Sequence, residues 1–138
     1  MSYEIVSFKL SEGVSMDILV STGRKTFMEK LAGNPKDQNR AAVIAKTADR
    51  VGRNGISWAK ASKTLKAITA TVSVFELRVP GKVIRVMTYV HDGETPVYLF
   101  DFDGHQGKGG KIPQSLIDKA NTLAEAAREC IAREGLPR

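Results

Sequence analysis

The sequence predicts a single α+β domain: an N-terminal strand and two helices packed on a small antiparallel meander sheet, with a long C-terminal helix. Three observations support this prediction. Apolar residues recur at helical spacing between residues 22 and 53 and again after Pro113. Between these segments, three runs of β-branched and aromatic residues are separated by glycine-containing turns. The length of 138 residues, 42% of them hydrophobic, suits one domain with its own core.

The first half is predicted to hold one strand and two helices. Residues 3–10 favour a strand, and residues 14–20 fit either a second strand or an irregular segment. A helix that starts at Thr22 ends before Pro35, because proline lacks an amide donor and restricts the residue before it. A second helix is predicted over residues 37–53, with an aspartate as its N-cap.

The second half is predicted to hold the meander and the last helix. Residues 72–79, 83–90 and 96–102 read as three strands, separated by turns that contain Pro-Gly and Asp-Gly. Residues 103–112, with four glycines, read as a loop. The final helix is predicted over residues 114–135, where apolar side chains form one continuous stripe.

The positive charge of the chain is concentrated in one segment. The formal net charge is +6, yet residues 24–66 alone carry 11 basic and 3 acidic residues. Such a segment favours nucleic acid, an acidic protein or an anionic membrane as a partner, or is simply a solvated helix face. The basic residues at helical spacing, and therefore candidates for RNA binding, are Lys46, Arg50, Arg53, Lys60, Lys63 and Lys66. The last three would line one side of their segment if that segment is helical.

Several classes of protein are excluded by composition. The single cysteine, Cys130, excludes a disulfide framework and a cysteine-rich zinc site within the chain. No apolar run approaches the roughly 18 residues of a membrane span, and the N-terminus lacks the features of a signal peptide. We therefore expect a cytoplasmic protein with no metal or other cofactor and no membrane partner.

Four short pieces follow one another in a characteristic order between residues 24 and 125. A helix pair that ends in glycine is followed by Lys-Thr-Leu-Lys at 63–66, and a Phe-Glu-Leu-Arg strand occupies 75–78. The next strand carries a single arginine, Arg85, and a basic loop closed by Pro113 precedes the last helix. In order and spacing these pieces resemble the RelE/ParE toxin superfamily, most of all the HigB-like, phage-derived branch of type II toxin–antitoxin systems.

The resemblance implies a toxin that cuts messenger RNA on the ribosome and that a cognate antitoxin protein holds inactive. Metal-free RNA cleavage needs a base for the 2′-OH proton, cations for the charged phosphorane and an acid for the leaving 5′-oxygen. Arginine clamps phosphate, histidine transfers protons near neutral pH, and loop lysines contact phosphates. The candidate catalytic residues are Arg78, Arg85, His105 and Lys108. Further candidates for RNA binding are Lys82, Lys111 and Tyr89, the last by stacking on a base.

An alternative interpretation stays open. Arg78 and Arg85 could be sheet residues paired with Glu76 or another acid, in a non-catalytic RelE-like or phage protein. Such a protein would inhibit a protein target or bind nucleic acid through residues 24–66. The sequence departs from the family pattern in three places: residues 9–23 stand as an insertion, the final helix runs past Ile131, and glycines separate the two lysines of the basic loop. The last of these bears on the choice, because it concerns catalysis more than the fold.

Overall fold

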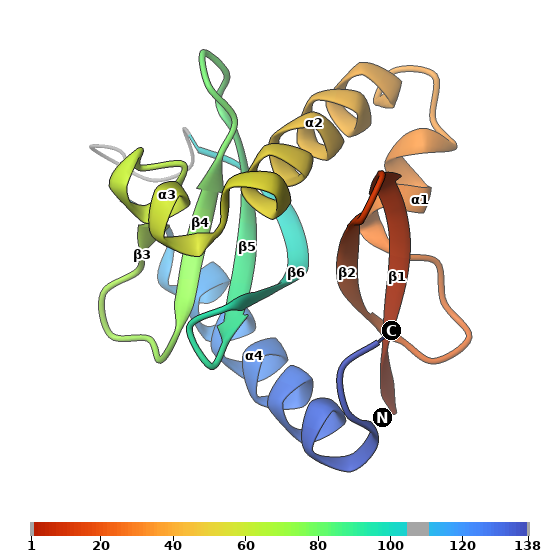
Figure 1. The fold of residues 1–138 in the computed structure, drawn as a ribbon, viewed down its shortest axis with the longest axis vertical. Coiled ribbons are helices and arrows are strands. Elements are labelled where there is room, and N and C mark those ends of the chain that lie inside the picture. Colours follow the sequence, from red (N-terminus) through yellow and green to blue (C-terminus); the bar gives the residue numbers. More distant parts are fainter. Residues whose placement is uncertain (1, 105–110, 138) are drawn as a thin grey trace.

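The computed structural model describes residues 2–104 and 111–137, which form a six-stranded sheet between two helical layers (Figure 1). The first three helices cover one face of the sheet and the long C-terminal helix crosses the other. The predicted α+β class is confirmed. The strand order is β1-β2-β6-β5-β4-β3.

The sheet is larger than the predicted meander and is mixed. Its strands are β1 (Tyr3–Ser11), β2 (Val14–Ser21), β3 (Leu65–Ala67), β4 (Val74–Arg78), β5 (Ile84–His91) and β6 (Thr95–Asp103). Strands β3 to β6 form an antiparallel meander, whereas the β1–β2 hairpin joins it through a short parallel pairing of β2 with β6. The N-terminal strand is thus part of the sheet, and residues 14–20 form a strand.

Residues 2–104 and 111–137 hold four helices, where three were predicted for the chain. They are α1 (Phe27–Ala32), α2 (Gln38–Asn54), α3 (Ile56–Ala61) and α4 (Gln114–Glu134). Helix α1 starts after Thr26, not at Thr22, because Thr26 and Glu29 form a reciprocal capping box. Asp37 occupies the N-cap of α2 as predicted, although its side chain makes no capping hydrogen bond.

Two apolar layers hold the helices on the sheet. On one face, Ile44, Ala48 and Val51 of α2 pack with buried side chains that include Val86 and Tyr98. On the other face, α4 presents alanines at positions 120, 124 and 127, each fully buried. Small side chains at this spacing let the α4 backbone approach the sheet closely. None of the helices in the described ranges is long and apolar enough to cross a membrane.

Gly52 marks a close contact between α2 and β2. A Cβ atom at this position would lie far inside van der Waals contact of Val14 Cγ1, and β-branched Val14 has little rotamer freedom. We expect Gly52→Ala to lower the free energy of unfolding by about 1–3 kcal/mol, although alanine is the better helix former. Urea denaturation would show a lower midpoint at an unchanged m value.

The control for this prediction is Val14→Ala, which removes the clashing atom. In that background Gly52→Ala should cost much less, because the introduced methyl then fills the space that Val14 has vacated. Equal destabilisation in the two backgrounds would contradict the proposed contact.

Candidate functional site

Three charged side chains meet on the α4 face of the sheet, where β4 pairs with β5. The Cα atoms of Arg78 and Arg85 are directly paired across the two strands, so their side chains lie on the same face. Glu76 precedes Arg78 by two residues and therefore shares that face. Arg78 Nε lies 2.5 Å from Glu76 Oε1, and Arg85 Nε lies 4.0 Å from the same oxygen. We call Glu76, Arg78 and Arg85 the strand cluster.

Arg85 is held firmly within the strand cluster. Its Nη1 donates to the carbonyl oxygens of Lys82 and Ile84, at 2.8 and 2.9 Å. The backbone of Gly104 lies so near that a Cβ there would come within 3.1 Å of Arg85 Cγ. The side chain is 21% exposed, so it presents part of its guanidinium to solvent from a fixed position.

Glu76 is the buried member of the cluster, with a side chain that is 9% exposed. A buried carboxylate requires a cationic or hydrogen-bonding partner, and Arg78 supplies it. This is the ion pair that the non-catalytic alternative expects. Arg78 is nevertheless 36% exposed, and the cluster as a whole keeps one net positive charge.

A groove of about 560 Å³ opens beside the strand cluster on the α4 side. Strand β4 contributes Glu76 and Arg78 to its wall, β3 contributes Lys66, and Ile117 of α4 closes it. Lys111, from the segment that leads into α4, adds a further cation. The groove therefore combines one carboxylate with several cations among the described residues that line it.

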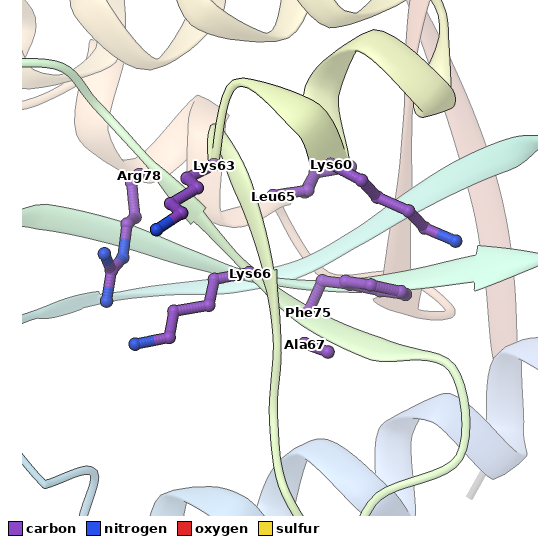
Figure 2. Close-up of a pocket in the computed structure, with 7 residues that line it drawn as sticks. All are labelled: Lys60, Lys63, Leu65, Lys66, Ala67, Phe75 and Arg78. Atoms are coloured by element: carbon purple, nitrogen blue, oxygen red, sulfur yellow. The ribbon is translucent and has the colours of Figure 1, made fainter.

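A second hollow, of about 500 Å³, lies at the edge of the sheet around β3 (Figure 2). Lys60, Lys63 and Lys66 line it together with Phe75 and Arg78. The three lysines do not lie on one helix, because α3 ends at residue 61 and Lys63 adopts a left-handed conformation with φ of 61°. One lysine comes from α3, one from the following turn and one from β3. We call this space the edge hollow.

The basic residues of α2 form a separate surface. Lys46, Arg50 and Arg53 are exposed on α2, which covers the sheet face opposite α4. The guanidinium of Arg50 lies 5.5 Å from the centre of the Trp58 ring, and Arg53 pairs with Asp49 at 2.5 Å. These residues are therefore not brought together with the strand cluster.

The remaining candidates have different environments. Tyr89 is buried under α4, 3% exposed, with its hydroxyl 3.0 Å from His91 Nδ1 and the Arg128 guanidinium over its ring. Its ring offers no face to a base in this structure. Lys82 is exposed in the β4–β5 turn. His105 and Lys108 lie outside the described residues.

Two residues of the site were not among the predicted site residues. Glu76 was considered only as a partner for the arginines, although its i, i+2 spacing to Arg78 in a strand places both on one face. Nothing in the sequence marked Phe75 as a binding residue, because an aromatic residue in a strand is typical of a hydrophobic core. Within residues 2–104 and 111–137, no group of three His, Cys, Asp or Glu side chains is placed to hold a metal ion.

Comparisons with family models, with curated proteins and with solved structures gave no match to this chain. We therefore infer a function from the strand cluster and the two spaces beside it, together with the pattern of the sequence.

A double-mutant cycle on Glu76 and Arg78 tests the strength of this ion pair. We expect Glu76→Gln and Arg78→Gln to couple by about 1 kcal/mol in urea denaturation, because the carboxylate is largely desolvated and Arg78 is only partly exposed. The control is the pair Arg133–Glu134 on α4, in which both side chains are more than half exposed and for which about 0.5 kcal/mol or less is expected. A coupling no larger than that of the control would show that Glu76 does not depend on Arg78.

Proposed function

We propose that the protein is a metal-free, ribosome-dependent mRNA endoribonuclease, acting in the cytoplasm as the toxin of a type II toxin–antitoxin system. The observation that carries this proposal is the strand cluster: two arginines paired across adjacent strands, with a carboxylate near both, of which Glu76 and Arg78 line a cationic groove. The resemblance of the sequence to HigB-like toxins supports the same assignment.

The arginines are suited to hold the scissile phosphate. A guanidinium has five N–H donors, and each arginine of the cluster uses only some of them within the protein. Arg78 donates from Nε to Glu76, and its two terminal nitrogens make no hydrogen bond to another described residue, so they can bind oxygen of a ligand. Arg85 donates from Nη1 to two carbonyl groups, which fixes its direction, and within the described ranges no group accepts a hydrogen bond from its Nη2. Fixed donors of this kind stabilise a phosphorane without reorganising during the reaction.

The proton transfers need one acceptor and one donor. The 2′-oxygen attacks phosphorus and forms a 2′,3′-cyclic phosphate while the bond to the 5′-oxygen breaks. Glu76 is the carboxylate that faces the groove, so we assign it to accept the 2′-OH proton. His105 stays our candidate for the group that protonates the leaving 5′-oxygen.

We assign the docking of the protein onto its partner to the basic surface of α2, which lies outside the strand cluster. Residues 24–66 carry the whole positive excess of the chain, and α2 exposes Lys46, Arg50 and Arg53 away from the strand cluster. A surface of this charge fits ribosomal RNA or an acidic antitoxin segment, and its attraction would steer association over a distance of about 8 Å at physiological salt.

Replacement of Arg85 tests catalysis. We expect expression of the unaltered protein to stop growth and Arg85→Ala to relieve the arrest. In an assay with purified ribosomes, cleavage of bound mRNA should fall by about 100-fold or more, because one fixed phosphorane donor is lost. Primer extension on the mRNA measures the cleavage.

Two controls accompany this test. Arg133→Ala removes an exposed arginine at the end of α4 that pairs with the exposed Glu134, and it should leave cleavage unchanged. Arg85→Lys, with thermal unfolding measured for each variant, separates the loss of the donor from a loss of folded protein. Full toxicity of Arg85→Ala at matched protein level would contradict the catalytic role of Arg85.

One observation favours a second candidate, a non-catalytic inhibitor of a protein target or a nucleic-acid-binding module. Both arginines of the strand cluster already have partners within the protein. If expression stops growth while mRNA stays intact on the ribosome, a protein target is indicated. Salt-dependent binding to RNA without cleavage would indicate the binding module.

A further inference from the structure

We propose that the edge hollow is a nucleotide-binding subsite for single-stranded RNA, in which a base stacks on Phe75 while its phosphate is held by Lys63, Lys66 and Arg78. This inference rests on the proposed action on RNA, and it names how the RNA strand is held beside the strand cluster. It does not depend on whether the strand cluster is catalytic.

The floor of the edge hollow is apolar and suits the face of a base. Leu65, Ala67 and Phe75 contribute to it. Ala67 and Phe75 are directly paired across β3 and β4, so the small side chain of Ala67 leaves the Phe75 ring partly uncovered at the edge of the sheet. Base–aromatic stacking tolerates any sequence, because every base has a π-face.

The rim of the hollow is cationic on one side. Figure 2 shows the terminal nitrogens of Lys63, Lys66 and Arg78 on the same side of the hollow, while the side chain of Lys60 extends the other way toward Phe75. Lys63 and Lys66 are exposed, so their ammonium groups reach solvent. An apolar floor with a cationic rim on one side matches the two ends of a nucleotide, its base and its phosphate.

Lys60 already occupies the place above the ring that we assign to the base. Its ammonium lies 5.1 Å from the centre of the Phe75 ring, an arrangement that is favourable for a cation but weak at an exposed site. A base with its own π-system can take this place, since the four-carbon side chain of lysine lets the ammonium move aside. The contact shows that this face of the ring is reached by an exposed side chain and is not covered by the core.

The edge hollow and the groove beside the strand cluster are adjacent. Lys66, Ala67 and Arg78 line both of them, one on each side of the short edge strand β3. An RNA strand with one base stacked on Phe75 would therefore carry its next phosphate past Arg78, toward Glu76 and Lys111. The subsite would thus determine which phosphate of the RNA strand reaches Arg78.

The test compares a short fluorescein-labelled oligoribonucleotide with an abasic ribose-phosphate oligomer of the same length, using fluorescence anisotropy. We expect the unaltered protein to bind the oligoribonucleotide more tightly than the abasic oligomer. Phe75→Leu should weaken binding of the oligoribonucleotide by about fivefold or more and leave the abasic oligomer unaffected, because leucine keeps the packing but loses the ring. Phe8→Leu on β1, at the opposite edge of the sheet, is the matched control and should change neither.

Lysine substitutions test the phosphate half of the subsite. Lys66→Gln should weaken binding of both oligomers and reduce the slope of log K against log salt by about 0.7, the value for one phosphate contact on a single strand. Lys9→Gln, also on β1, should leave the slope unchanged.

Two outcomes would overturn the inference. One is equal affinity of the unaltered protein for the two oligomers. The other is an oligoribonucleotide affinity that Phe75→Leu leaves unchanged. Base-dependent binding without cleavage in the ribosome assay would instead overturn the endonuclease and leave the subsite standing.

Discussion

The register between β4 and β5 is the constraint on which the site depends. Direct pairing of Arg78 with Arg85 puts both guanidinium groups on the α4 face, and strand alternation adds Glu76 to that face. The same register turns Leu77 and Val86 toward α2, where both are fully buried. A shift of one residue would move apolar side chains to the wrong face, so the packing of the core fixes the geometry of the charged cluster.

Helix α4 determines how much of the sheet face beneath it is exposed to solvent. Its buried alanines at 120, 124 and 127 lie over the middle of the sheet, where they pack with a layer that includes Met87 and Phe100. At its N-terminal end the helix contributes only Ile117 to the groove, beside Glu76 and Arg78. The charged ends of β4 and β5 therefore lie where the helical cover stops, which is why a buried carboxylate and partly exposed arginines coexist there.

The local elements were readable from the sequence, and the long-range pairings were not. Helices α2 and α4 have strong apolar periodicity, and β4, β5 and β6 are bounded by turn residues, so their positions followed from local chemistry. The parallel pairing of β2 with β6 joins Ile18 to Tyr98, and no local pattern encodes such a contact. Strand β3 has three residues, too few for a period of two to be recognised, and α3 has only six. The arginines of the site were found because their residue type carries chemistry, whereas Phe75 has the same sequence signature as a core residue.

The fold places many of the basic residues of the chain at two surfaces. Six of the eleven basic residues in 24–66 are gathered by the fold in two places: three on the exposed face of α2, and three around the edge hollow. Lys66 is directly opposite Glu76 across β3 and β4, so the positive segment ends beside the buried carboxylate of the strand cluster. Glu76 in turn offsets one of its two neighbouring arginines. The basic surface as a whole would thus attract a polyanion. The polyanion would be bound most tightly at Lys66 and Arg78, which line both the edge hollow and the groove beside the strand cluster.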